Sequence, residues 1–237
     1  LCARTGLRRG VRSFYYYSLD RCRSFAGPFW LPDWGQPGIA ARTSYSIDGP
    51  QEATLFLTAN KQSNGEEGRV FCARTEDGGR TFPFLAWIGP EPEGFAIMPA
   101  GLRLSPSVLL CAVRCRAGDR GAAWIDLYRS TDDGHTWEML ARPVTFRGQG
   151  HGGNPPTLNE LPDGRLCLTY GDRGGPPYRM CARLSADGGA TWEDEIVLRD
   201  DGGSPDLGYP RSVVRSDGAV VTVYYWNDRP DSDGERY

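Results

Sequence analysis

An eight-residue pattern occurs four times in the chain at a nearly constant spacing. It has a Ser or Thr, an Asp two positions later, a Gly in three of the copies, and a final aromatic residue. The copies occupy residues 18–25, 75–82, 130–137 and 185–192, and their aspartates are 57, 55 and 55 residues apart. A repeat of this length predicts several similar units, each of which buries its apolar faces only against its neighbours.

Each copy has the chemistry of a tight hairpin turn. The Asp carboxylate can accept hydrogen bonds from N–H groups of its own loop, and glycine adopts positive φ without steric cost. The copy at 18–25 departs from the pattern, because Cys22 replaces the glycine and Phe25 replaces the tryptophan that ends two other copies. One such turn recurs in each unit, so we expect the aspartates to be structural rather than catalytic or metal-binding.

Composition favours turns over helices and limits the range of partners. The chain has 31 Gly and 18 Pro in 237 residues, well above the usual combined share of roughly 12%. A net charge of −3 and a pI near 5.5 predict no nucleic-acid partner and no binding to an anionic membrane. There is no run of about 18 apolar residues that could span a membrane. No metal and no other cofactor is expected.

The seven cysteines are an odd number without close paired spacing. Cys111, Cys167 and Cys181 lie in apolar, strand-like runs, where a free thiol behaves as a small hydrophobic group. Buried, reduced cysteines are therefore favoured over a disulfide framework or a zinc site. This weakly favours a reducing compartment such as the cytoplasm, although the sequence does not define the localisation.

Short runs of alternating apolar and polar residues, bounded by Asp-Gly and Pro-rich turns, predict antiparallel strands. Each unit contains four such runs, as in 40–48, 53–59, 69–75 and 84–88. Four strands in about 55 residues are typical of a β-propeller blade, and a stacked solenoid is the alternative. We expect a single domain over residues 1–237, truncated at both ends, with three whole blades and two partial ones.

The four turns resemble the Asp-boxes, or BNR repeats, of the sialidase (neuraminidase) superfamily. The resemblance extends from about Tyr15 to the end of the chain. It implies an all-β fold, a six-bladed propeller of four-stranded antiparallel blades, of which this chain forms part of the ring. Asp-boxes also occur in non-catalytic propellers and in other glycosidases, so the resemblance implies a fold more directly than an activity.

Polar residues gather at one predicted rim of the propeller. In an up-and-down blade, the start of the first strand and the end of the second lie at the rim opposite the repeat turns. The residues expected to bind substrate there are Arg42, Arg114, Arg173, Arg211, Asn154 and His151. Guanidinium binds a carboxylate through two parallel hydrogen bonds, so the arginines predict an acidic sugar as ligand.

Two arginines and one glutamate resemble substrate-binding and acid/base positions of sialidases. Arg42 opens a first strand and resembles the first carboxylate-binding arginine, and Arg173 resembles the second. Glu67, or Glu66 beside it, lies where the family places its acid/base aspartate. The resemblance therefore implies that Glu67 acts as the general acid.

Tyr209 resembles the nucleophilic tyrosine of the family. A tyrosine with an ordinary pKa of about 10 needs a base beside it to attack an anomeric carbon. The family supplies a glutamate, and in this sequence Asn154 stands at that position. Asp206 is the nearest carboxylate that could act instead.

The sequence thus supports three hypotheses for function. The first is a hydrolase of the exo-α-sialidase type that removes a terminal acidic sugar from glycans. The second is a non-catalytic propeller that binds a glycan or a protein. The third is a hydrolase for a different acidic polysaccharide, such as one that contains uronic acids, since arginines bind that carboxylate equally well. The oligomeric state stays open.

Overall fold

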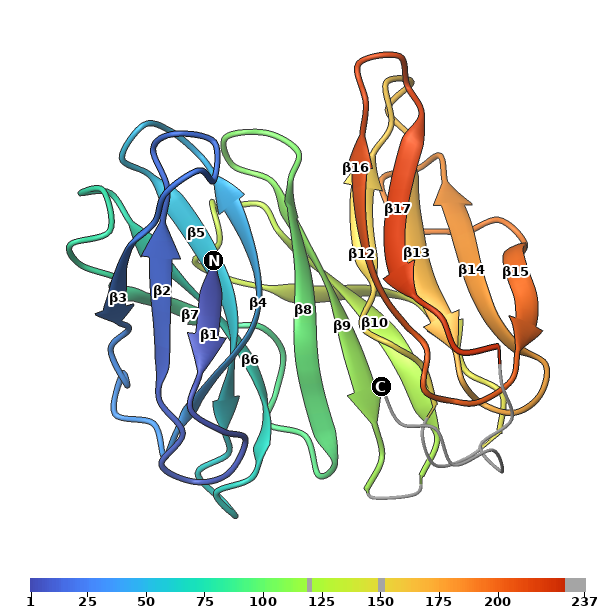
Figure 1. The fold of residues 1–237 in the computed structure, drawn as a ribbon, viewed down its shortest axis with the longest axis horizontal. Coiled ribbons are helices and arrows are strands. Elements are labelled where there is room, and N and C mark those ends of the chain that lie inside the picture. The colour runs from blue at the N-terminus through green and yellow to red at the C-terminus, as the bar shows by residue number, and fades with distance from the viewer. Residues whose placement is uncertain (119–120, 149–151, 229–237) are drawn as a thin grey trace.

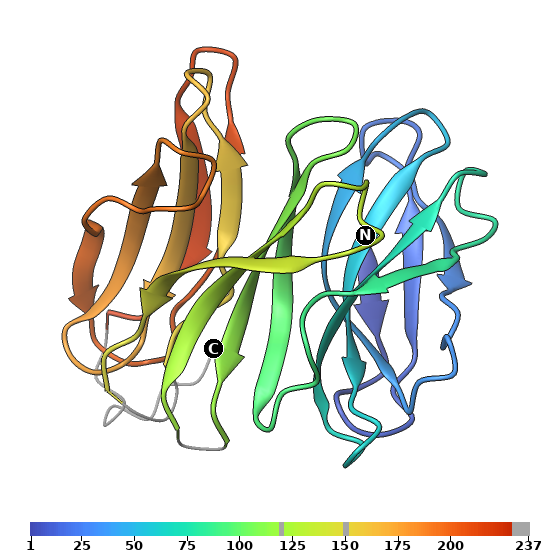
Figure 2. The ribbon, with the colours of Figure 1, turned by 180° about the vertical axis from the view of Figure 1, so that it is seen from behind.

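The computed structural model describes residues 1–118, 121–148 and 152–228, and within these ranges it contains strands and no helix. The strands form five antiparallel sheets that lie side by side (Figures 1 and 2). The first sheet has three strands: β1 (Cys2–Arg4), β2 (Ser13–Tyr17) and β3 (Ala26–Trp30). The second has four: β4 (Ile39–Ile47), β5 (Ala53–Asn60), β6 (Glu67–Thr75) and β7 (Phe84–Trp87).

The remaining sheets follow the same order along the chain. The third sheet contains β8 (Phe95–Arg103), β9 (Leu109–Arg116), β10 (Ala123–Ser130) and β11 (Glu138–Thr145). The fourth contains β12 (Thr157–Glu160), β13 (Leu166–Asp172), β14 (Tyr178–Ser185) and β15 (Ile196–Gly202). The fifth has two described strands, β16 (Gly208–Val214) and β17 (Val220–Tyr225). The all-β prediction and the four-stranded antiparallel units are therefore confirmed.

The first strands of successive sheets lie together at the centre. β1 contacts β4, β4 contacts β8, β8 contacts β12, and β12 contacts β16. The last strands of the first and fourth sheets, β3 and β15, lie at the two sides of the view (Figure 1). This radial arrangement brings residues from all five sheets close to one axis. It is the propeller-like arrangement that the repeat predicts.

The sequence did not predict two short strands, β1 and β3. β1 has only three residues, too few to show an alternating pattern. β3 contains Gly27 and Pro28, which are typical of turns rather than strand interiors. Both strands pair with β2, so they are held by tertiary contacts more than by local preference.

The core is divided into apolar layers between neighbouring sheets. Phe56 and Leu57 are adjacent on β5 and both fully buried, yet they belong to different layers. Phe56 packs with Leu109 of the third sheet, while Leu57 packs with Leu31, which follows β3. Successive side chains of a strand point to opposite faces, so the second sheet is covered on both sides. No sheet of this kind can bury its surface alone.

The four repeat turns share one hydrogen-bond pattern. In the turn at 130–137, the Ser130 hydroxyl donates to Asp132 Oδ1 (2.8 Å) and accepts the N–H of Gly134 (2.8 Å). Asp132 also accepts the N–H (2.9 Å) and the hydroxyl (2.5 Å) of Thr136. The same four bonds occur in the turns at 18–25, 75–82 and 185–192. The aspartates therefore close their own turns, as the sequence predicts for structural residues.

The repeat turns also join neighbouring sheets through their glycines. Gly134 (φ 90°) and Gly189 (φ 99°) have left-handed backbones that disfavour any side chain. A Cβ at Gly134 would lie 3.0 Å from Leu85 Cδ2 of the preceding sheet, and one at Gly189 would lie 2.6 Å from Leu127 Cδ2. Glycine is required here for both conformation and space.

Replacement of Cys22 by glycine is expected to stabilise the protein by about 0.5 kcal/mol. Cys22 has φ 63° but is exposed, so its side chain is accommodated at a conformational cost. Removal of a side chain from a left-handed backbone raises the free energy of unfolding by about 1 kcal/mol. The greater conformational freedom of glycine in the unfolded chain offsets part of this gain. Urea unfolding monitored by tryptophan fluorescence measures the change.

Gly189→Ala is the matched control, and it should lose about 2 kcal/mol of stability because the new methyl group meets Leu127. A less stable Cys22→Gly protein would contradict the prediction.

Acid should weaken the repeat turns. Hydrogen bonds from the Thr136 hydroxyl and N–H and from Ser130 lower the pKa of Asp132 to about 2. The corresponding bonds lower the pKa values of Asp20, Asp77 and Asp187 to about 2. A carboxyl with a lowered folded-state pKa stabilises the fold fully above about pH 4, and this contribution disappears as the pH falls towards 2.

The urea midpoint is therefore expected to fall steadily between pH 5 and pH 2. Asp187→Asn removes one of the four carboxyls, so the fall should be shallower in this variant than in the wild type. Equal slopes for the two proteins would show that the turn carboxyl does not contribute to the pH dependence.

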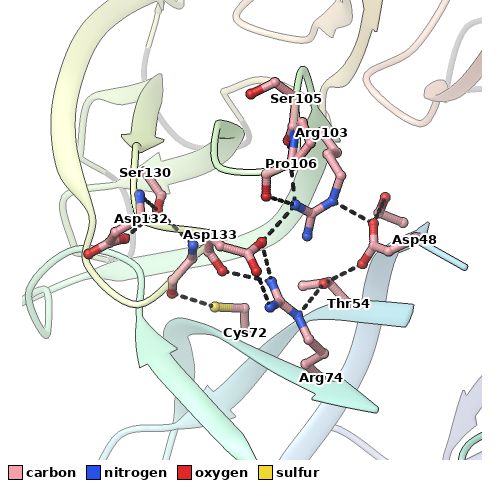
Figure 3. Close-up of polar contacts among 12 residues, drawn as sticks. Asp48, Thr54, Cys72, Arg74, Arg103, Ser105, Pro106, Ser130, Asp132 and Asp133 are labelled. Carbon is pink, nitrogen blue, oxygen red and sulfur yellow. Dashed lines mark hydrogen bonds and ion pairs between the residues drawn. The ribbon is translucent and has the colours of Figure 1, made fainter. Parts of the chain in front are cut away.

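An ion-pair network joins the second and third sheets at the rim that carries the repeat turns (Figure 3). Asp133 lies in the turn at 130–137 and accepts from Arg74 Nη1 (2.5 Å) and Nη2 (2.8 Å) of β6. It also accepts from Arg103 Nη1 (2.7 Å) of β8. Arg103 Nε donates in turn to Asp48 Oδ1 (2.6 Å), in the turn that follows β4. The turn after β4 and the repeat turn at 130–137 therefore lie on the same rim.

All seven cysteines are free, and five of them are buried. Burial raises the pKa of the Cys72 thiol to about 11 and that of Cys181 to about 12, so both stay protonated at neutral pH. Within the described ranges, no cluster of three or more His, Cys, Asp or Glu side chains is suited to hold a metal ion. The same ranges contain no helix that could cross a membrane.

Candidate functional site

A pocket of about 300 Å³ opens at the centre, where the first strands of the sheets meet. All five sheets contribute to it, either from these strands or, in the fourth sheet, from the segment just before β12. Its lining residues are Cys2, Arg4, Ala41, Arg42, Tyr45, Met98, Pro99, Pro155, Tyr209 and Arg211. Three of the expected site residues, Arg42, Tyr209 and Arg211, therefore lie together although they are up to 169 positions apart in sequence.

The first strands are irregular where they reach the pocket. β4, β8 and β16 each shift register against their second strands, at segments that contain Arg42, Met98 and Tyr209 respectively. Met98 (φ 55°) and Tyr209 (φ 51°) have left-handed backbones. Bulges of this kind redirect a side chain, and strained non-glycine residues concentrate at functional sites. The strands thus depart from regular pairing where they line the pocket.

A largely buried carboxylate pairs with Arg42. Glu67, at the start of β6, places Oε1 3.1 Å from Arg42 Nε, and its side chain is 11% exposed. Burial raises the pKa of Glu67, while the charges of Arg42, Arg4 and Arg114 oppose this rise. Two residues were candidates for the acid/base position. Glu67 pairs with Arg42, whereas Glu66 is exposed.

Two further arginines add positive charge beside the pocket. Arg114 on β9 is 7% exposed, and its pKa is lowered to about 10 by burial and by the charge of Arg173. It stays protonated at neutral pH, which is far below that value. Arg42 Nη1 and Arg114 Nη1 lie 3.7 Å and 3.6 Å from the sulfur of Met98. Both guanidinium groups therefore contact the Met98 side chain.

Tyr209 lies at the pocket with its side chain partly in solvent. The residue is 38% exposed, and its ring stacks on that of Tyr225 of β17, with the centroids 5.8 Å apart. Asp206, expected as the base for Tyr209, instead accepts a hydrogen bond from the Tyr225 hydroxyl (2.6 Å). Burial and Asp206 raise the pKa of Tyr225, so its hydroxyl stays protonated. The structure therefore shows Asp206 paired with the neighbour of Tyr209.

Asn154 and Arg173 form a pair next to the pocket. Asn154 was expected to contact substrate, but it is fully buried. Its Oδ1 accepts from Arg173 Nη1 (2.9 Å), and its Nδ2 donates to the carbonyl of Leu207. Both polar atoms of the amide are thus engaged within the protein. His151, the remaining expected site residue, lies outside the described residues.

Sequence reasoning missed Arg4 and the apolar wall formed by Met98 and Pro99. Arg4 was missed because β1 was not predicted. The wall had a readable signal, since an X-Pro pair recurs within or just before three first strands: Met98-Pro99, Asn154-Pro155 and Tyr209-Pro210. Proline cannot donate to a ladder, so its recurrence marks the places where regular pairing breaks.

The chemical character of the pocket follows from these contacts. Arg4, Arg42 and Arg211 supply positive charge, and Tyr209 supplies a hydroxyl group. None of the described lining residues is a carboxylate, and Glu67 is paired with the lining residue Arg42. The arrangement can bind an anion beside a tyrosine hydroxyl.

A central pocket framed by the first strands of radially arranged antiparallel sheets is typical of β-propellers. Solved structures agree with this assignment. No protein-family model matches the chain, and no curated protein matches it in sequence. The structural comparison therefore carries the assignment of the fold.

Several solved structures are similar to this chain. A protein of unknown function from Dyadobacter fermentans has a TM-score of 0.73 and 26% identity over 93% of this chain. The Hadza microbial sialidase Hz136 has a TM-score of 0.69 and 16% identity, also over 93% of this chain. The α-L-arabinofuranosidase Arb93A from Fusarium graminearum has a TM-score of 0.60 and 15% identity over 78%. The chain spans 60%, 48% and 55% of these three structures, respectively. These similarities support the propeller-like, all-β fold of this chain.

Proposed function

We propose that this chain belongs to a sialidase-like glycoside hydrolase that removes a terminal acidic sugar from glycans. The observation that carries the proposal is the grouping of Arg4, Arg42 and Arg211 around Tyr209 in one pocket. The similarity to a sialidase and an arabinofuranosidase supports the glycosidase class. The proposal includes a single six-bladed propeller domain, with Asp-boxes at the repeat turns, of which residues 1–237 form part.

Each site residue has a proposed role. Arg42, Arg173 and Arg211 bind the carboxylate of the sugar, and Arg114 adds to the positive field that attracts it. Arg4, from β1, takes part in the same field. His151 is also proposed to contact the ligand.

Tyr209 is the proposed nucleophile of the reaction. Its oxygen bonds to the anomeric carbon as the bond from that carbon to the leaving oxygen breaks, and water later releases the sugar. Glu67 gives its proton to the leaving oxygen, a role helped by burial, which raises its pKa. Asp206 is the proposed acceptor of the Tyr209 proton, with Tyr225 holding the carboxylate in place. A tyrosine nucleophile already departs from the usual pair of catalytic carboxylates.

The full-length protein tests the proposal with three fluorogenic substrates. These are the 4-methylumbelliferyl α-sialoside, β-glucuronide and α-L-arabinofuranoside. Release from the α-sialoside alone is the expected result. Release from the glucuronide alone would assign the pocket to a different acidic polysaccharide. Release from the neutral arabinofuranoside alone, or no release by a folded protein, would contradict the proposal.

A non-catalytic glycan-binding propeller is the second candidate function. It is favoured by the lack of a carboxylate among the described lining residues of the pocket. Calorimetric titration of the same protein with N-acetylneuraminic acid separates the two candidates. Binding without turnover of the sialoside would support the binding protein, and binding with turnover would support the hydrolase.

A further inference from the structure

We infer that Asn154 is a positioning residue that fixes the Arg173 guanidinium and the backbone before Tyr209 in one arrangement. The inference rests on the proposed function, because it assigns Arg173 to anion binding and Tyr209 to nucleophilic attack. Asn154 precedes β12, Arg173 follows β13, and Leu207 precedes β16. The amide thus connects the first two strands of the fourth sheet to the entry of the fifth.

The two ends of the Asn154 amide have different partners. Oδ1 accepts from Arg173 Nη1 at 2.9 Å. Nδ2 donates to the carbonyl of Leu207, two residues before Tyr209. An amide supplies an acceptor and a donor at adjacent positions, whereas an ionised carboxylate is an acceptor alone. The site therefore requires both halves of the side chain.

Close packing keeps the Asn154 side chain in this orientation. A Cβ at Gly171 would lie 2.5 Å from Asn154 Nδ2, and one at Gly208 would lie 1.9 Å from it. Gly208 also has φ 99°, a conformation that favours glycine. The amide is fully buried, so it cannot turn towards a ligand in the pocket without breaking these contacts. Its effect on a substrate has to pass through Arg173 or Tyr209.

This position gives Asn154 control over two separate properties. A guanidinium binds a carboxylate best when its planar face is already oriented, and a buried acceptor supplies that orientation. Tyr209 has a strained backbone (φ 51°), which persists only when the surrounding structure holds it. The bond to Leu207 fixes the chain just before that residue. Loss of the acceptor should affect binding, and loss of the donor should affect the chemical step.

Two substitutions of Asn154 separate these effects. Asn154→Asp keeps an acceptor for Arg173 and loses the donor to Leu207. Asn154→Leu has a similar volume and loses both. Asn159→Leu is the matched control, because Asn159 Nδ2 donates to the carbonyl of Ser212 (3.4 Å) and so also joins β12 to β16, five residues farther along both strands.

Turnover of the 4-methylumbelliferyl α-sialoside is the first readout. Asn154→Asp should keep KM within about twofold and lower kcat about tenfold, since the acceptor remains and the donor is lost. Asn154→Leu should raise KM about tenfold and lower kcat by a similar factor. Asn159→Leu should leave both constants within about twofold of the wild type. Equal effects of the three substitutions, or none, would overturn the inference.

Two measurements without substrate keep the inference separate from the proposed function. Phenylglyoxal labelling of Arg173, followed by mass spectrometry, should be several-fold faster in Asn154→Leu and unchanged in Asn154→Asp. Amide hydrogen exchange in the peptide 203–211 should be faster in both Asn154 variants and unchanged in Asn159→Leu. If the wild type does not hydrolyse the sialoside, the proposed function fails and these two measurements still decide the positioning role. Wild-type rates in Asn154→Asp at 203–211 would overturn it, even where Asn154→Leu does not fold.

Discussion

Replacement of Tyr209 by phenylalanine is expected to lower kcat for the 4-methylumbelliferyl α-sialoside by about a thousandfold or more, because the nucleophilic oxygen is removed. The ring is kept, so its stacking on Tyr225 is expected to persist. Affinity for N-acetylneuraminic acid should therefore stay within about threefold of the wild type, since the arginines that bind the carboxylate are untouched. A loss confined to turnover is what distinguishes a nucleophile from a residue that only lines the pocket.

Tyr45→Phe provides the matched control for this substitution. Tyr45 lines the same pocket from β4, is 56% exposed, and has no role in the proposed mechanism. Its variant should keep kcat within about threefold of the wild type. Stopped assays over hours are needed to measure so small a residual rate. Mass spectrometry checks that the variant contains no wild-type protein. A Tyr209→Phe protein that retained a tenth of the wild-type kcat would rule out Tyr209 as nucleophile.

The parts of the fold that could be predicted from the sequence are those determined by local patterns. The repeat turns depend on hydrogen bonds between residues at most four positions apart, so their four copies are visible in the sequence. The alternation of apolar and polar residues in β4 to β17 is also a local pattern, so these strands too could be recognised in the sequence. β1 escaped prediction because three residues carry no period, and Arg4 was missed with it.

The candidate site could be predicted only in part, because its geometry depends on contacts between distant strands. Arg42 and Tyr209 were expected among the site residues, and both line the pocket. Asn154 was expected to face substrate, and its burial is set by Gly171 and Gly208 from two other strands. Asp206 was expected beside Tyr209, and no local pattern shows that Tyr225 of the next strand donates to it. Strand position is readable from a sequence, whereas the partner of a side chain across strands is not.

Replacement of Asp133 by alanine is expected to destabilise the protein by about 3 kcal/mol, which is the low end of the cost of breaking a buried ion pair. Asp133 itself is 38% exposed, so solvent screens part of its interaction. Its partners are more buried: the side chains of Arg74 and Arg103 are 11% and 18% exposed. Alanine would leave both guanidinium groups without this carboxylate between two sheets, and Asp48 would remain for Arg103 alone.

The backbone at Asp133 supplies the control that isolates the ion pairs. Asp133 has φ 62°, and the equivalent positions in two other repeat turns are Gly78 (φ 73°) and Gly188 (φ 72°). Asp133→Gly removes the carboxylate but relieves the left-handed strain, which alanine would keep, so it should be about 1 kcal/mol more stable than Asp133→Ala.

Asp133→Asn keeps the side-chain shape and one acceptor oxygen, and its stability should lie between those of Asp133→Ala and the wild type. Urea unfolding of the three variants at low and high salt measures these differences, and the wild type should lose more stability with salt than any of them. An Asp133→Gly protein as stable as the wild type would show that the aspartate is retained in this turn for a reason other than joining the two sheets.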